Sequence, residues 1–114
     1  MIKLKQYNVE YLKGVIMQYI PNDRFKAIKV KDCASLMGVN PRIVRHLIQE
    51  LRGDGYPICS TPYDGYWIAR SEDDVNLTIK FLDTQKQTLE DTIKALEETK
   101  KNIGGNNGDT ELLV

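Results

Sequence analysis

The sequence predicts an α+β fold that is mostly helical, with three short helices and a β-hairpin followed by a long C-terminal helix. Three observations lead to this prediction. Apolar residues recur at three- and four-residue steps through the first half of the chain. Two short runs rich in β-forming residues then flank a Pro-Tyr-Asp-Gly turn at residues 62–65. Finally, apolar residues at heptad spacing continue to residue 103.

Length and composition restrict the class of protein. A chain of 114 residues fits one small domain with an appendage. Its longest uncharged apolar run is far below the roughly 18 residues of a membrane-spanning helix, and its first residues lack the apolar core of a signal peptide. Cys33 and Cys59 are isolated, and the chain has one histidine, no glycine-rich phosphate loop and no evident carboxylate pair. We therefore expect a cytoplasmic protein that is not an enzyme and has no membrane partner, metal or cofactor.

Capping and periodicity predict the first two helices. Asn8 is a good N-cap for a helix that ends before Pro21. One face of that helix carries Val9, Leu12, Ile16 and either Tyr19 or Ile20. A second, short helix is expected over residues 31–37, with core candidates Ala34, Leu36 and Met37.

A third helix follows after a turn. Gly38 supplies the turn, Asn40 is a suitable N-cap, and Pro41 fits the first helical position, where its missing N–H costs nothing. Two helices separated in this way predict a helix-turn-helix. The apolar stripe of the third helix consists of Val44, Leu47, Ile48 and Leu51. Basic and amide side chains lie largely off that stripe: Arg42, Arg45, His46, Gln49 and Arg52.

Residues 58–61 and 66–69 read as the two strands of the hairpin. With this hairpin, residues 28–69 resemble the winged helix-turn-helix of the biotin-operon repressor type, a module that also opens regulators of the WYL class. The resemblance is carried by G-V-N-P-R-I-V-R-H-L-I-x-x-L, which begins at Gly38, and by the G-Y-P-I turn that begins at Gly55. Winged folds often have a short strand before the second helix, and residues 27–29 could form it.

The resemblance implies which residues of the third helix pack and which bind double-stranded DNA. Its core positions are Val39, Val44, Ile48 and Leu51. The predicted DNA-binding residues are Asn40, Arg42, Ile43, Arg45, His46, Gln49 and Arg52, together with Tyr63 in the wing. His46 is as well explained by a phosphate contact or by solvent as by base reading. The wing departs from similar wings because residues 60–69 contain no basic residue and place Asp64 at the tip, so its contact with DNA is left open.

Acidic residues after Ser71 open a last helix that reaches about 48 Å at 1.5 Å per residue, longer than the small domain could cover. Its apolar seam is interrupted by Lys86 and Lys100 and predicts a two-stranded coiled coil, with the fold-back of the helix onto its own domain as the alternative. The predicted dimerisation residues are Ile79, Leu82, Leu89, Ile93 and Leu96. The predicted division is a winged domain over residues 1–70, the dimerisation helix over 71–104 and a flexible tail over 105–114.

The net charge is zero, but residues 1–57 hold ten Lys or Arg against five Asp or Glu, whereas residues 71–103 hold five against eight. A basic head is typical of nucleic-acid binders. We therefore expect a sequence-specific DNA-binding protein, a small homodimeric transcriptional regulator whose compact layout resembles those of phages and mobile elements. The alternative is a winged-helix adaptor that binds proteins in a replication or assembly complex, which the acidic wing tip and the neutral total charge favour.

Overall fold

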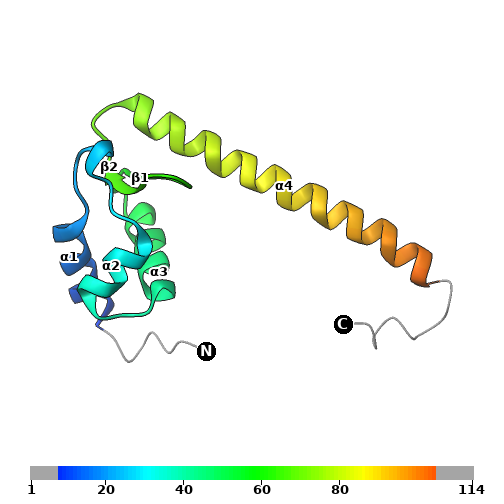
Figure 1. Ribbon diagram of the computed structural model, residues 1–114, viewed down its shortest axis with the longest axis horizontal. Coiled ribbons are helices and arrows are strands. Elements are labelled where there is room, and N and C mark those ends of the chain that lie inside the picture. The colour runs from blue at the N-terminus through cyan, green and yellow to red at the C-terminus, as the bar shows by residue number, and fades with distance from the viewer. Residues whose placement is uncertain (1–7, 105–114) are drawn as a thin grey trace. The chain divides into compact units, whose positions relative to one another are not determined.

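The computed structural model of the chain describes residues 8–104. In order, the elements are α1 (Val9–Tyr19), the 3-10 turn η2 (Arg24–Lys26), α2 (Val30–Met37), α3 (Pro41–Gly53), β1 (Ile58–Thr61), β2 (Gly65–Ile68) and α4 (Glu72–Gly104). Three helices, a β-hairpin and a long C-terminal helix confirm the predicted winged-helix architecture (Figure 1). The predicted tail, residues 105–114, lies outside the described residues.

Helix α1 begins where its cap predicts. The Asn8 side chain accepts a hydrogen bond from the Tyr11 backbone N–H at 3.1 Å, and the helix ends at Tyr19, two residues before Pro21. Ile16 and Ile20 are buried whereas Tyr19 is exposed, so Ile20 takes the core position that the sequence left open between them. Helix α1 and its C-terminal cap thus pack against the core through Ile16 and Ile20.

The turn between α2 and α3 has the conformation that the sequence predicts, but one side chain of α2 that was expected in the core is exposed. Gly38 has a φ of 68°, a left-handed conformation in which glycine carries no Cβ penalty. Cys33 and Ala34 are buried, and Met37 packs against the core beside them. The expectation that Leu36 belongs to the core is wrong, because it falls outside the arc that these three residues cover and is 58% exposed.

The main core is shared by α1, α2, α3 and the first residue of β1. It consists of Ile16, Ile20, Cys33, Ala34, Ile43, Val44, Leu47, Ile48, Leu51 and Ile58. The predicted core positions of α3 are confirmed, with Val39 packed at the edge of the cluster. Helix α3 contributes half of these residues. Its contacts with α1, α2 and β1 fix its orientation.

The hairpin has a different environment on each face. Ile58 pairs with Ile68 and Cys59 with Trp67 in an antiparallel register, and successive side chains of a strand point to opposite faces. Ile58 and Ile68 therefore pack on the main core, while Cys59 and Trp67 are buried on the other face. An isolated bridge between Ile28 and Tyr66 confirms that the segment before α2 pairs with the wing.

The first turns of α4 pack on that second face. The Ser60 N–H donates to the hydroxyl of the buried Thr78 at 3.1 Å, and the Arg70 N–H donates to the Asp74 carboxylate at 3.0 Å. The hydrogen bond from the Arg70 N–H lowers the pKa of Asp74, and burial partly opposes that shift. The chain divides into two compact units between Ile79 and Lys80, so the turns of α4 that make these contacts belong to the first unit.

Among the helices of residues 8–104, none combines the length and the apolar character that crossing a membrane requires.

Candidate nucleic-acid interface

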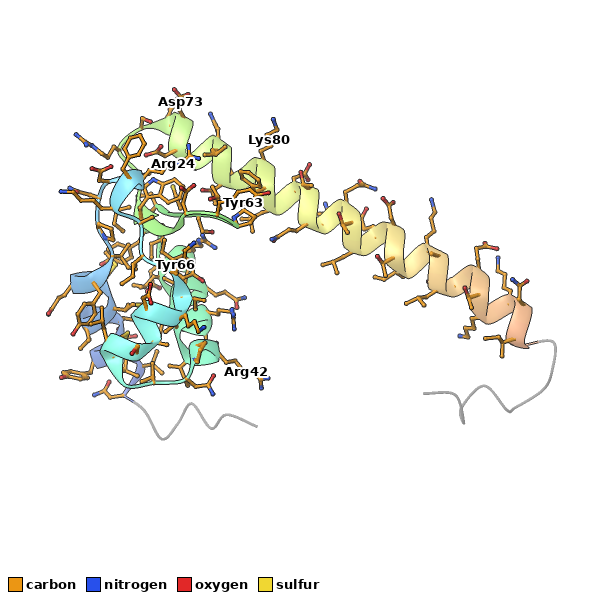
Figure 2. The ribbon with its side chains drawn as sticks, in the orientation of Figure 1. Arg24, Arg42, Tyr63, Tyr66, Asp73 and Lys80 are labelled. Atoms are coloured by element: carbon orange, nitrogen blue, oxygen red, sulfur yellow. The ribbon has the colours of Figure 1, made fainter. Side chains whose placement is uncertain are left out.

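The solvent face of α3 carries the polar side chains that the sequence predicts for DNA contact. Asn40 caps the helix by accepting the Arg42 N–H at 2.8 Å, and Pro41 occupies the first turn. With the opposite side buried, Arg42, Arg45 and Gln49 are exposed and His46 is half-buried. Their spacing of three and four residues places them in one row along the helix. Figure 2 shows Arg42 projecting outward at the N-terminal end of α3.

Two of the predicted DNA-binding residues are placed differently. Ile43 is 1% exposed and belongs to the core, so the expectation that it faces DNA is wrong. It precedes Leu47 by four residues and therefore shares its buried side. Asn40 is exposed, but its side-chain oxygen Oδ1 already accepts the Arg42 N–H as the helix cap.

Arg52 connects α3 to the wing. Its Nε donates to the backbone carbonyl of Ile58 at 2.8 Å, and its Nη2 donates to the Ser60 hydroxyl at 3.0 Å. Burial lowers the pKa of the Arg52 guanidinium, which remains far above neutral pH. Because the donors that point at β1 are used within the protein, the structure supports a wing-positioning role for Arg52 in place of the predicted DNA contact.

Tyr66 lies on β2, where it is half-buried and packs against the main core. Burial raises the pKa of its phenol, and the positive charges of Arg52 and then Arg45 partly oppose that rise.

The tip of the wing is a tight turn held by one hydroxyl. The Thr61 hydroxyl donates to the Asp64 carboxylate at 2.6 Å and accepts the backbone N–H of Asp64 at 3.0 Å and of Tyr63 at 3.3 Å. Gly65 follows with a φ of 102°, and a Cβ there would lie 2.4 Å from the carbonyl oxygen of Ile28. The turn is thus fixed by local bonds and by the close approach of the segment before α2.

Two cations reach this tip from outside the hairpin. The Arg24 Nε donates to the Asp64 carboxylate at 3.1 Å, and the Lys29 ammonium donates to the Tyr63 carbonyl at 2.7 Å. The Thr61 hydroxyl, together with Arg24, lowers the pKa of Asp64, which therefore stays ionised as an internal partner. The Arg24 guanidinium also lies over the Trp67 ring, 5.7 Å from its centroid.

Sequence reasoning missed these cations because it counted charges only along the hairpin. The one signal that could have found them is the predicted pairing of residues 27–29 with the wing. That pairing places the segment with Arg24 and Lys29 beside the hairpin whose turn carries Tyr63 and Asp64. Tyr63 itself, a predicted DNA-binding residue, is 80% exposed at the tip.

Neither cysteine is placed for chemistry. Both are buried, and burial raises the pKa of the Cys33 thiol to about 11 and that of Cys59 in the same direction. Such thiols are protonated near neutral pH, whereas the thiolate is the reactive form. Within residues 8–104, no three His, Cys, Asp or Glu side chains are grouped so that they could hold a metal ion.

The predicted dimerisation residues form an apolar row along α4. Ile79, Leu82, Leu89, Ile93 and Leu96 are 44–63% exposed. The side chains between them are polar apart from Phe81 and Ala95, and most residues of α4 beyond Lys80 are exposed. An exposed apolar row of this length on a helix is typical of a surface that packs against another element or another chain.

No protein-family model matches the sequence. Among solved structures, the chain is similar to a GntR family transcriptional regulator from Listeria monocytogenes. The two chains are 19% identical, with a TM-score of 0.41, and the similarity covers 86% of this chain and 83% of the regulator.

Proposed function

We propose that this protein binds double-stranded DNA in a sequence-specific manner and acts as a small dimeric transcriptional regulator. The observation that carries the proposal is the exposed row of Arg42, Arg45 and Gln49 on a helix whose opposite side is core. A helix of this kind, second in a helix-turn-helix, enters the major groove with its N-terminal residues nearest the bases. Arg42 occupies that end of α3.

The chemistry of the row suits base reading. An arginine can donate to both O6 and N7 of guanine, and a glutamine can pair with the N6 and N7 edge of adenine. Each such bidentate contact contributes about 1–3 kcal/mol of discrimination. The half-buried His46 lies in the same row and is assigned a phosphate or base contact at its accessible edge.

The apolar row of α4 supports a coiled-coil dimer. Its heptad places Ile79 and Ile93 at the a positions and Leu82, Leu89 and Leu96 at the d positions. Isoleucine at a with leucine at d favours two strands in parallel. Lys86 and Lys100 fill the remaining a positions, where a polar residue lowers stability but limits register and strand number.

The charges beside the seam favour the parallel arrangement. All three e positions are acidic, namely Asp83, Glu90 and Glu97, while the g positions Gln85 and Thr92 are neutral. Antiparallel pairing sets e against e and brings the acidic rows together, whereas parallel pairing sets e against g. The lysines at a then meet their own copies, but each has acidic neighbours three or four residues away on its own helix. We therefore propose a parallel dimer that binds inverted half-sites about one helical turn, or a multiple of it, apart.

A second candidate is the protein-interaction adaptor. The observation that favours it is the 58% exposure of Leu36 on α2, an apolar side chain that no DNA contact requires, together with the zero net charge. An adaptor binds its partner through such apolar side chains and needs no phosphate contacts.

Selection of duplexes from a random pool by the full chain separates the two candidates. A DNA-binding regulator enriches a defined motif, and its affinity for that motif falls steeply with salt because phosphate contacts release counterions. An enriched inverted repeat supports both the regulator and its dimer. Recovery of a pool that is indistinguishable from the input, with no salt-dependent binding, supports the adaptor instead.

A further inference from the structure

The buried position of α4 is occupied by a polar residue. Of residues 72–103, Thr78 alone is buried, at 5% exposure, whereas the apolar side chains of the helix are half-buried or exposed. Burying a hydroxyl is unfavourable unless the hydroxyl is hydrogen-bonded. The place of Thr78 is therefore determined by its bonds as well as by its packing.

Those bonds attach α4 to the wing. The Thr78 hydroxyl donates to the Asp74 carbonyl of its own helix at 3.2 Å and accepts the Ser60 N–H of β1 at 3.1 Å. Four other threonines of α4 also donate to the carbonyl four residues before them, but they are exposed: Thr84, Thr88, Thr92 and Thr99. Thr78 differs from them because it is buried and holds a second element.

Ser60 extends the connection to α3. Its side-chain hydroxyl accepts Nη2 of Arg52 at 3.0 Å, and Arg52 belongs to the last turn of α3. One residue of β1 is thus bonded both to the helix of the proposed DNA contact and to the helix of the proposed dimer. Apolar packing has no preferred direction, whereas a hydrogen bond restricts both distance and angle. The bonds at Ser60 therefore define the position of α4 on the wing more narrowly than packing alone.

Helix α4 continues from this attachment into the apolar row. It spans Glu72–Gly104 without a break, and the boundary between the two compact units, after Ile79, lies within it. We propose that Thr78 and Ser60 set the spacing between the two DNA half-sites, because their bond fixes the direction in which the dimer seam leaves each winged unit. This inference rests on the proposed DNA binding by α3 and on the proposed dimer. Thr78 is a positioning residue in this account, since it acts through Ser60.

Spacing is sensitive to such an attachment. An inverted repeat is bound by two copies of α3 at once, so the distance between the copies selects the distance between the half-sites. One additional base pair moves a half-site by about 3.4 Å along the duplex and turns it by about 35° around the axis. A rigid attachment excludes the displaced half-site, whereas a loosened attachment accepts it.

Selection of duplexes from a random pool by the full chain tests this inference, because it reports half-site sequence and half-site spacing separately. The wild type should enrich an inverted repeat with one spacing. Thr78→Val keeps the shape of the side chain but leaves the Ser60 N–H without its acceptor, so it should enrich the same half-sites at several spacings. Its preference for the wild-type spacing over one longer by a base pair, measured as a ratio of affinities, should fall several-fold.

Three further variants complete the test. Thr78→Ser keeps the hydroxyl and should keep the single spacing. Thr84→Val is the matched control, because it loses a hydroxyl that bonds to its own helix at 3.0 Å on an exposed turn, and it should also keep the single spacing. Asp74→Ala removes the carboxylate that accepts the Arg70 N–H at 3.0 Å, which loosens the same attachment and should broaden the spacing. It decides the test if Thr78→Val does not fold.

The possible results separate this inference from the proposed function. A folded, dimeric Thr78→Val protein that keeps the wild-type spacing overturns the inference and leaves the proposed function standing, even if its affinity is lower. Wild-type half-sites without a preferred spacing overturn both the inference and the proposed dimer. Absence of any enriched motif for the wild type overturns the proposed DNA binding itself.

Discussion

Replacement of Arg52 by alanine should loosen the wing rather than remove a DNA contact. The variant loses two hydrogen bonds from a half-buried guanidinium, to the Ile58 carbonyl at 2.8 Å and to the Ser60 hydroxyl at 3.0 Å. Hydrogen bonds to charged groups contribute about 1.5–3 kcal/mol each when buried. Two such bonds would contribute about 3 kcal/mol or more if fully buried, but because this site is partly solvated we expect a smaller total loss of about 2 kcal/mol.

Urea unfolding measures this loss with two signals. Circular dichroism reports the helices, and the fluorescence of Trp67, the one tryptophan of the chain, reports the wing. Arg52→Ala should lower both midpoints, while Arg45→Ala, on the exposed row of α3, should change the free energy of unfolding by less than about 0.5 kcal/mol. An Arg52→Ala protein with an unchanged midpoint but impaired DNA binding refutes the positioning role and restores the direct contact.

Three further predictions concern the seam, the wing turn and the wing-tip carboxylate. Leu89→Glu should convert the dimer to a monomer in analytical ultracentrifugation, whereas Lys94→Glu, outside the seam, should not. A wild-type protein that sediments as a monomer contradicts the proposed dimer. Gly65→Ala should lower the melting temperature, because the added Cβ lies 2.4 Å from a backbone oxygen at a φ of 102°, while Gly14→Ala, in open space within α1, should raise stability by about 1 kcal/mol. The lowered pKa of Asp64 implies stability that is present above its unfolded pKa of roughly 3.9 and lost as pH falls below it. The stability gap between wild type and Asp64→Asn should therefore narrow in that acid range, and a constant gap counts against the tip bonds.

The parts of the fold that could be predicted depend on local chemistry. Asn8 and Asn40 cap helices through bonds to amides two and three residues away, so the signal is contained in a short stretch of sequence. The strands flank a turn that ends in glycine, and the Ile28 bridge lies where the resemblance predicted pairing. Neighbouring residues determine the caps and the turn, whereas the bridge between Ile28 and Tyr66 was predicted from the resemblance alone.

The misassigned side chains depend on tertiary placement. Ile43 lies four residues before Leu47, so periodicity alone assigns it to the core, but the resemblance assigned it to DNA. The exposure of Leu36 depends on how α2 is rotated against α3, which its short apolar pattern does not determine. Arg52 has the composition of a DNA contact, and only the position of β1 shows that its donors are used inside the protein.

The wing-tip cations were the least accessible to sequence reasoning. The bonds from Arg24 and Lys29 span 40 and 34 residues, and they form only after the segment before α2 pairs with the hairpin. Charge counted along a segment therefore misjudges the potential of a surface that two segments share. For the same reason, the division between units follows α4 to Ile79, since Thr78 bonds to the wing.

The exposed row of α3 is tested most directly by the affinity of the Arg42→Ala, Arg45→Ala double variant for the selected duplex. Loss of two base or phosphate contacts should weaken binding by at least about 1–3 kcal/mol per residue that reads a base, with an unchanged melting temperature. Gln18→Ala, an exposed residue on the distant helix α1, should bind as the wild type does. Wild-type affinity in the folded double variant contradicts the assignment of α3 to the major groove.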